Sequence, residues 1–294
     1  MVTIENSKLK VEINELGAEL FSIQNLSSGR ECLWCGNEAY WRSRSPVLFP
    51  IVGALYDGVC RIDGVEYEMK QHGVARALPF EVVKSEPSEV LLSLKSSEAT
   101  KKNYPYEFEL KIDYKLCEST LVISYQVVNP SDETIYFQLG AHPGFNFLDF
   151  NPDAPVQGYF AFNDVAEDSE LMLSKFEAGY LSDEKQTIKL CGQKLPIVKD
   201  TFDNDALILE ESQSCDISLL DAKGEEYIRV KYDAPVVGLW SKPCGGYAPF
   251  TCIEPWYGRC DRAGYTGEFK DKDWMQKLSA HQSFTTSVVV EIAK

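Results

Sequence analysis

One of the few histidines in this chain stands in an apolar segment where a buried strand would not place it. The sequence has three histidines, and His142 lies in LGAHPGFNF, residues 139–147. Pro143 cannot donate a backbone hydrogen bond to a neighbouring strand, so a strand must end, bulge or lie at an edge at this point. Gly144 lets a ligand come close to the main chain. We therefore predict a strand interruption beside a groove, with the His142 imidazole facing a ligand.

A second histidine occurs in a similar setting. His72 lies in QHGVAR, residues 71–76, directly before Gly73, which again allows close approach to the backbone. An isolated histidine more often has a structural role, so a functional role for His72 or His142 depends on a partner from another segment. The third histidine, His281, has no ionisable neighbour in the sequence, and we expect it at the surface or as a cap of a helix that precedes it.

A glutamate is the best candidate for that partner. Glu254 lies in CIEPWYGRCD, residues 252–261, between an apolar strand end and a turn rich in proline and aromatic residues. Such a carboxylate is partly desolvated, which raises its pKa and makes it a better base. The alternative is an ion pair between Glu254 and Arg259 or Arg262. A histidine and a glutamate together suit acid and base catalysis near neutral pH, where each group contributes about 10²- to 10⁴-fold to a rate.

Two aspartates form a fourth polar segment. Asp203 and Asp205 lie in TFDNDALILEE, residues 201–211, just before an apolar strand. Aspartate side chains at such positions form turns with their own backbone, which would explain both residues without a ligand. The G-x-S-x-G motif of a nucleophilic serine and the glycine-rich phosphate loops do not occur in the sequence. The sequence therefore indicates proton transfer without a metal, a nucleotide or another cofactor.

The cysteines do not suggest a metal site. Nine cysteines, an odd number, are scattered without a disulfide framework, and we expect reduced thiols. Cys32 and Cys35 have C-x-x-C spacing, but a zinc site needs a second pair of ligands. Cys252 and Cys260 are eight positions apart, which is not a metal-ligand spacing.

Charge and hydropathy limit the partners. The net charge of −16 repels phosphate backbones, so we predict no nucleic acid partner. The same charge is compatible with a neutral ligand such as a sugar and mildly disfavours a phosphorylated one. The start of the chain lacks the features of a signal peptide, and no apolar run approaches the roughly 18 to 20 residues that cross a bilayer. We therefore expect a cytoplasmic protein with no membrane partner, as a monomer or a homodimer.

Alternation of apolar and polar residues determines the predicted fold. It is strongest in residues 106–116, YEFELKIDYKL, and continues in residues 120–129, TLVISYQVVN, which together predict a β-hairpin. Shorter segments alternate in the same way: KLKVEI, ELFSIQN, EVLLSLK, YIRVKYD and TTSVVVEIA. A helical period occurs only in short pieces such as residues 271–278. We predict one all-β domain over residues 1–294, a single large antiparallel β-sandwich.

Five segments, taken in order, resemble the aldose 1-epimerase (galactose mutarotase) superfamily and in particular its LacX-like branch. They are PVLFPIVG at residues 46–53, QHGVAR, LGAHPGFNF, FDNDALIL and CIEPWYGRCD. The resemblance covers nearly the whole chain. It implies a galactose mutarotase-like supersandwich with the active site in an open groove on one sheet. It also implies interconversion of the α and β anomers of a free aldose.

The resemblance implies a role for each matched residue. Glu254 matches the base that takes the proton from the anomeric hydroxyl, and His142 matches the acid that protonates the ring oxygen. His72 matches a second histidine that binds the sugar, and Asp205 matches an aspartate that accepts hydrogen bonds from sugar hydroxyls. Trp256 would offer an apolar face to the C–H groups of the sugar. The chemistry agrees, because opening a hemiacetal ring requires one proton removed and one supplied at neighbouring oxygens, and no cofactor.

Ala54 departs from the family pattern. Members of the family usually carry an arginine shortly after the PVLFPIVG-like segment, where it helps to hold the sugar. We expect Arg76 or Arg44 to supply that contact here. Asp203 is an alternative to the matched aspartate, and Phe145 is a second candidate for an apolar contact.

Three hypotheses about function follow from these observations. The leading one is an aldose 1-epimerase that acts on a free hexose. The second is a hexose-6-phosphate 1-epimerase, in which Arg44 and Arg76 would bind the phosphate. The third is a non-catalytic sugar-binding protein on the same scaffold. A glycoside hydrolase ranks last, because it would need two opposed carboxylates.

Overall fold

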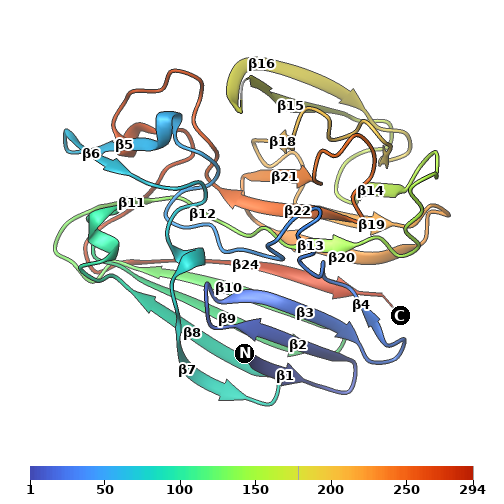
Figure 1. Ribbon diagram of the computed structural model, residues 1–294, viewed down its shortest axis with the longest axis horizontal. Coiled ribbons are helices and arrows are strands. Elements are labelled where there is room, and N and C mark those ends of the chain that lie inside the picture. Colours follow the sequence, from blue (N-terminus) through green and yellow to red (C-terminus); the bar gives the residue numbers. More distant parts are fainter. Residues whose placement is uncertain (178, 294) are drawn as a thin grey trace.

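The structure is a computed structural model that describes residues 1–177 and 179–293. Its regular elements are strands, apart from four short 3-10 turns in the described residues: Tyr56–Gly58, Ala75–Ala77, Thr100–Lys102 and Phe269–Asp271. None of the helices described is long and apolar enough to cross a membrane. The prediction of an all-β fold is confirmed (Figure 1).

The larger of two facing sheets contains the hairpin that the alternation predicted. Its strand order is β17-β14-β19-β20-β24-β10-β9-β8-β7, and every neighbouring pair is antiparallel. The bounds are β7 Glu81–Glu86, β8 Glu89–Lys95, β9 Glu109–Cys117, β10 Thr120–Val128, β14 Gly158–Phe162, β17 Lys194–Ile197, β19 Asp216–Leu220, β20 Glu226–Tyr232 and β24 Ser283–Ile292. The hairpin pairs Leu121 with Leu116 and Val127 with Leu110, so the apolar side chains of both strands share one face.

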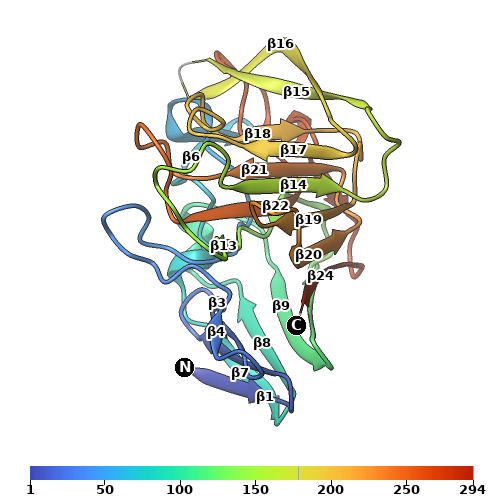
Figure 2. The same ribbon diagram turned by 90° about the vertical axis from the view of Figure 1, so that its right-hand side faces the viewer.

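The second sheet carries the polar segments of interest. Its order is β12-β22-β21-β18-β15-β16, with β13 also paired to β22. The bounds are β12 Leu139–Gly140, β13 Gly144–Asn146, β15 Glu170–Glu177, β16 Tyr180–Lys189, β18 Leu207–Leu209, β21 Val236–Trp240 and β22 Phe250–Tyr257. Figure 2 shows β18, β21 and β22 stacked beside β14, β19 and β20 of the larger sheet. One hydrophobic cluster joins both sheets, since it contains Phe160 and Leu219 from one and Leu209 and Ile253 from the other.

Smaller sheets complete the structure. The N-terminal strands form a four-stranded sheet: β1 Val2–Glu5, β2 Leu9–Asn14, β3 Glu19–Asn25 and β4 Arg30–Glu31. Two further pairs are β5 Val59–Ile62 with β6 Val65–Glu68, and β11 Ile135–Phe137 with β23 Gln276–Leu278. The Tyr114 hydroxyl in the hairpin donates a 2.7 Å hydrogen bond to the carbonyl of Ala18, which ties the N-terminal sheet to the larger one.

The helix predicted for residues 271–278 is wrong. A 3-10 turn ends at Asp271, and residues 276–278 form strand β23. Leu278 is buried and pairs with Ile135 on β11, so pairing with a distant segment overrides the weak local helical period. His281 therefore follows a strand rather than a helix, and its exposed ring lies 2.9 Å from Asp132.

Candidate active site

The interruption around His142 lies in the middle of an otherwise continuous ladder. β12 pairs Gly140 with Trp256, and β13 pairs Gly144 with Cys252, on the same neighbouring strand β22. The segment between β12 and β13 carries His142 across from the part of β22 that carries Glu254. The predicted strand interruption beside His142 is confirmed. Its physical basis is Pro143, which lacks the backbone N–H that a ladder requires.

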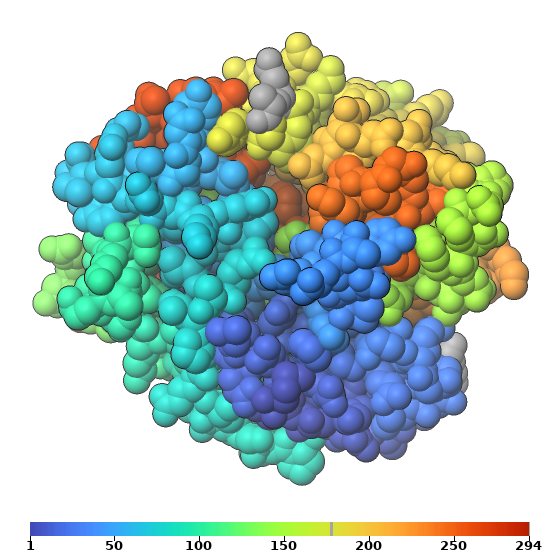
Figure 3. Space-filling view, in the orientation of Figure 1, coloured from blue at the N-terminus to red at the C-terminus, as the bar shows by residue number. Residues whose placement is uncertain are grey.

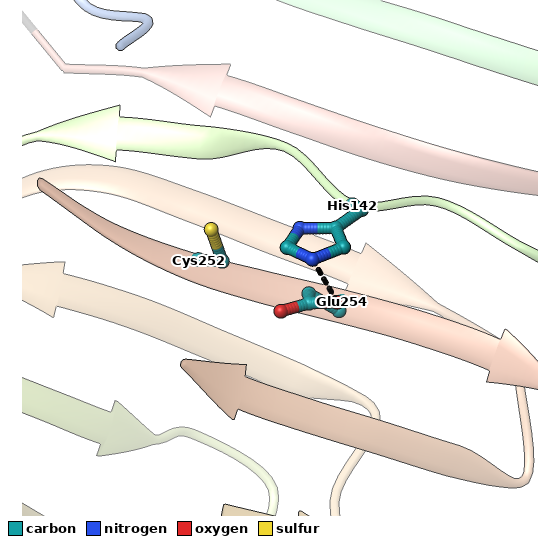
Figure 4. Close-up of side chains that lie close together, drawn as sticks. All are labelled: His142, Cys252 and Glu254. Atoms are coloured by element: carbon teal, nitrogen blue, oxygen red, sulfur yellow. Dashed lines mark ion pairs between the residues drawn. The ribbon is translucent and has the colours of Figure 1, made fainter. Parts of the chain in front are cut away.

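Glu254 and His142 form a buried pair. Only 1% of Glu254 and 7% of His142 is exposed to solvent. The Nε2 atom of His142 lies 3.1 Å from Oε2 of Glu254, as Figure 4 shows. Glu254 stands opposite Gly238 on β21, so the neighbouring strand presents no side chain beside it at that position.

Burial disfavours the charged form of each partner. Burial raises the pKa of Glu254 well above its ordinary 4.5; the nearby charge of Asp205 adds to this, and the indole of Trp256 opposes it. Burial lowers the pKa of His142 well below its ordinary 6.5, and electrostatic interactions with His72 and Arg76 lower it further. The resting pair therefore holds one proton, on the carboxyl, beside a neutral imidazole.

Arg259 and Arg262, the alternative ion-pair partners of Glu254, are paired with other carboxylates in this structure. The guanidinium of Arg259 pairs with Glu210 and Asp273. Arg262 pairs with Asp183 and also with Asp273. Both arginines are thus engaged with other carboxylates, which leaves the His142 imidazole as the ionisable group nearest to Glu254.

His72 is held in one tautomer by the backbone. The N–H of Gly53 donates a 3.1 Å hydrogen bond to Nδ1 of His72, and the His72 N–H donates a 2.9 Å bond to the Gly53 carbonyl. An Nδ1 that accepts a hydrogen bond leaves the ring proton on Nε2. Burial lowers the pKa of His72 to about 3, and the charge of Arg76 adds to this. The ring is therefore neutral at physiological pH and offers one N–H donor.

A hollow of about 490 Å³ joins these groups, and it opens to solvent near the centre of the face in Figure 3. Its polar and charged lining residues include Gln71, His72, Arg76, His142, Asp205, Lys242 and Glu254. Its apolar and aromatic lining residues include Tyr40, Trp41, Phe176, Ile208, Trp240 and Trp256. The hollow thus combines a few convergent polar groups with aromatic walls, which is the usual composition of a small-molecule site.

Most of the predicted binding residues meet at this hollow. His72, Arg76, Asp205 and Trp256 all line it, together with Ala54. His72 and Asp205 have φ angles of +67° and +75°. Backbone strain of this kind in residues other than glycine clusters at binding sites. The segment around the aspartates is a turn held by the backbone, in which the N–H of Asp205 donates a 3.0 Å hydrogen bond to the carbonyl of Phe202. Oδ1 of Asp205 accepts a 2.9 Å hydrogen bond from the N–H of the next residue, which is not the side-chain turn that we expected.

Three expected contacts lie elsewhere. The guanidinium of Arg44 stacks 3.4 Å over the ring of Phe21 and donates a 2.7 Å hydrogen bond to the Phe21 carbonyl. The Arg44 side chain is therefore committed to the N-terminal sheet, and the expectation that it contacts the ligand is not met. Phe145 is fully buried in the core, and Asp203 lies exposed in the turn before β18.

Two tryptophans beside His142 were not predicted. The ring of Trp41 stacks on the imidazole with centroids 4.7 Å apart and planes at 27°. Trp240 approaches the same imidazole edge-on at 5.5 Å. The only signal in the sequence is the presence of both tryptophans near polar or glycine-containing loops. Lys242 was missed as well, and it reaches the hollow from the loop that follows β21.

A third side chain accompanies His142 and Glu254. Cys252 lies on β22 two positions before Glu254, and in Figure 4 its side chain stands on the same side of β22 as the His142 ring. One donor atom from each of His142, Cys252 and Glu254 lies within 4.8 Å of the others. These three residues are able to hold a metal ion, whereas the cysteine spacing in the sequence gave no such indication. All nine cysteines are free, including Cys32 and Cys35.

Comparison with known proteins supports a single family. Residues 1–262 match the family model for aldose 1-epimerase. The chain is 30% identical over 290 residues to Protein LacX (chromosomal) of Lactococcus lactis subsp. lactis, with 94% of each chain covered. A galactose mutarotase related enzyme from Lactobacillus acidophilus superposes with a TM-score of 0.91 at 31% identity, covering 99% of this chain and 97% of that one. A galactose mutarotase-like protein from Lactobacillus casei ATCC 334 gives 0.92 at 29% identity, with 100% of both chains covered.

Proposed function

Because the chain belongs to the aldose 1-epimerase family, we propose that it interconverts the α and β anomers of a free hexose. The observation that supports this most is the buried pair of Glu254 and His142, whose facing atoms lie 3.1 Å apart at the wall of the hollow. One shared proton between a carboxyl and an imidazole is what the reaction uses. Each turnover opens and recloses a hemiacetal ring with no net gain or loss of protons.

Ring opening then proceeds by two proton transfers. The carboxylate of Glu254 takes the proton of the anomeric hydroxyl, and the imidazolium of His142 gives its proton to the ring oxygen. The C1–O5 bond breaks, the aldehyde rotates about C1–C2, and the reverse steps close the ring on the other face. The protonated Glu254 and neutral His142 left after opening are the forms that burial favours in the resting pair. The enzyme must therefore reach the charged pair when sugar binds, and sugar hydroxyls that donate to the carboxylate would favour it.

Other groups at the hollow would orient the sugar. His72 offers its Nε2–H as a donor, because Nδ1 is already bonded to Gly53. Asp205 offers carboxylate oxygens to sugar hydroxyls. Arg76, which also donates a 2.8 Å hydrogen bond to Ser43, takes the part of the family arginine that Ala54 replaces. The face of Trp256 suits the C–H groups of the ring.

Polarimetry of freshly dissolved α-D-glucose and α-D-galactose tests the proposal. We expect a first-order approach to anomeric equilibrium whose rate rises in proportion to protein concentration, above the rate in buffer. A folded protein that leaves the buffer rate unchanged for every aldose tried would overturn the proposal. Calorimetry with the same sugars would then separate a sugar-binding protein, which releases heat on titration, from a protein that does not recognise aldoses.

A hexose-6-phosphate 1-epimerase is the second candidate, and one observation favours it. Arg76 and Lys242 both line the hollow and would supply the cationic groups that a phosphate needs. The net charge of −16 opposes this reading, and Arg44, which was expected to take part, is bound to Phe21. Comparing kcat/KM for glucose and glucose 6-phosphate separates the two candidates. A preference for the phosphate that is lost in Lys242→Met would establish the second.

A further inference from the structure

The proposed proton transfers leave one buried side chain of the site unused. Cys252 is fully buried on β22, and residues two positions apart on a strand project from the same face. Its thiol consequently lies on the side of β22 that carries the Glu254 carboxylate, which is also the side of the His142 ring (Figure 4). No part of anomer interconversion requires a thiol at this position.

The three side chains make a coherent set of metal ligands. An imidazole nitrogen, a thiolate and a carboxylate oxygen bind zinc at about 2.0 to 2.3 Å. In a tetrahedron of that size, neighbouring donor atoms are separated by roughly 3.3 to 3.8 Å. His142 Nε2 and Glu254 Oε2 are already 3.1 Å apart, and all three donors lie within 4.8 Å of one another. A shift of about 1 Å in the thiol or the imidazole therefore completes three corners of the tetrahedron.

The charge balance of the set suits a dication. Burial raises the pKa of both the Cys252 thiol and the Glu254 carboxyl, so each group must release a proton to solvent when the cation binds. The thiolate and carboxylate then contribute two negative charges, and a bound Zn²⁺ or Cd²⁺ leaves the buried site neutral overall. A buried charge that lacks compensation is costly. In the part of the chain that the structure describes, Nδ1 of His142 is buried without a hydrogen-bond partner. Oε2 of Glu254 faces Nε2 of His142 at 3.1 Å, where a cation would replace the proton that the two groups share.

Access to the site comes from the hollow. His142 and Glu254 both line it, whereas Cys252 is fully buried behind them. A metal ion held by these three residues would have its fourth position directed to the hollow, where water or a sugar hydroxyl could occupy it. The ion would also bind the two atoms that move protons in the proposed reaction.

We propose that His142, Cys252 and Glu254 form a site for a thiophilic divalent cation such as Zn²⁺ or Cd²⁺, and that filling this site blocks anomer interconversion. The binding part of this inference stands on the geometry alone. The blocking part rests on the proposed function. The site is consequently inhibitory, in contrast to zinc sites that activate a water molecule.

A titration of the chelator-treated protein with CdCl₂ tests binding without reference to activity. We expect a saturable ultraviolet absorption from thiolate-to-cadmium charge transfer, with one ion bound per chain. Cys252→Ala should weaken binding by more than the roughly 10- to 100-fold that loss of an outer-shell partner costs. Cys260→Ala is the matched control, because Cys260 also lines the hollow but lies outside the set of three. It should keep the signal.

A signal that persists in Cys252→Ala, or that disappears equally in Cys260→Ala, would overturn the site. Cys252→Ser provides a second variant in case the alanine leaves a cavity against Phe250 and Trp34, which pack in the same cluster. Excess galactose should raise the apparent dissociation constant for Cd²⁺, since both ligands use Glu254 and His142.

Inhibition of mutarotation is measured by adding ZnCl₂ to the polarimetric assay. We expect inhibition that a chelator reverses and that needs at least about 100-fold more zinc in Cys252→Ala than in Cys260→Ala. Cadmium binding with full mutarotation would refute the blocking part alone. A protein that binds cadmium as described but shows no mutarotation in any condition would refute the proposed function and leave the metal site in place.

Discussion

The β9–β10 hairpin and strand β22 are both antiparallel ladders, yet they bury their side chains differently. In β9 the burial alternates, so that Leu110 and Ile112 face the core while Lys111 and Asp113 are partly exposed. In β22 the residues from Phe250 to Trp256 are all buried. The hairpin has one face in the core and the other toward water. β22 has one face in the core and the other in the wall of the site, which is why its polar residues are buried too.

The two strands differ in whether their second face meets water or the candidate site. A strand with regular alternation contributes mainly packing, because its outward face is solvated. A strand that is buried on both faces and carries a carboxyl group must pair that group or keep it neutral. In β22 the carboxyl of Glu254 faces His142, which belongs to the interrupted segment on the neighbouring strands, and burial keeps it protonated in the resting protein. Substitutions in the hairpin should therefore mainly reduce stability, whereas substitutions in β22 should mainly reduce activity.

The largest effect is expected in β22. Glu254→Gln keeps the size of the side chain but removes the base, so kcat for mutarotation should fall by about 10²- to 10⁴-fold. Stability should remain near that of the wild type, because the buried carboxyl is already neutral in the resting protein. Glu109→Gln in β9 is the matched control. Glu109 accepts a hydrogen bond from Ser93 and forms ion pairs with Lys95 and Lys111, all away from the hollow. Polarimetry on both variants checks the contrast, and equal rates would contradict it.

The hairpin should show the opposite behaviour. Ile112→Ala removes a fully buried side chain and should reduce the free energy of unfolding by about 2 to 5 kcal/mol. The kcat/KM of the folded fraction should not change, because Ile112 belongs to the larger sheet and is not among the residues that line the hollow. Urea unfolding followed by tryptophan fluorescence measures the loss. A stable Ile112→Ala protein with reduced kcat would show that packing and activity are not separable in this way.

Acid should destabilise the site region through His72. In the unfolded chain this histidine takes a proton near pH 6.5, whereas in the folded chain its pKa is about 3. Protons therefore favour the unfolded chain as the pH falls below 6.5. Protonation of His72 in the unfolded chain should reduce the free energy of unfolding by up to about 2 kcal/mol at pH 5. His72→Gln should remove this component. Urea unfolding at pH 7 and pH 5 tests it, and an unchanged pH dependence in the variant would contradict the buried neutral imidazole.

The smallest effect concerns the aromatic wall. Trp41 stacks on His142, and an aromatic face stabilises an imidazolium by about 0.5 to 2 kcal/mol. Trp41→Leu should thus lower kcat by about 2- to 30-fold with little change in stability. Arg44→Gln is the comparison, because the Arg44 side chain stacks on Phe21 instead, and its kcat should match the wild type. A larger loss of kcat in Arg44→Gln than in Trp41→Leu would contradict the role of Trp41 beside His142.

The sequence predicts the regular parts of this fold well and its interruptions less well. The hairpin follows from local alternation, although β9 begins at Glu109 rather than at residue 106. The helix expected at residues 271–278 fails because Leu278 pairs with Ile135, far away in the chain. The Arg44 side chain, which we expected at the ligand, stacks on Phe21. Both outcomes depend on contacts between separate segments, which no local sequence pattern records. The single-domain assignment of residues 1–294, the absence of a nucleic acid partner and the choice between monomer and homodimer stay predictions.

The sequence by itself determined the all-β class, the segments that carry the candidate site residues and the interruption at His142, since each of these depends on residue type and near neighbours. Only the tertiary structure decided that His142 Nε2 lies 3.1 Å from Glu254, that Arg76 and Lys242 line the hollow, and that one donor atom of Cys252 lies within 4.8 Å of both His142 and Glu254. The physical reason is strand register. The pairing of β12, β13 and β22 places residues from distant segments side by side, and that pairing is fixed by the packing of the whole sandwich.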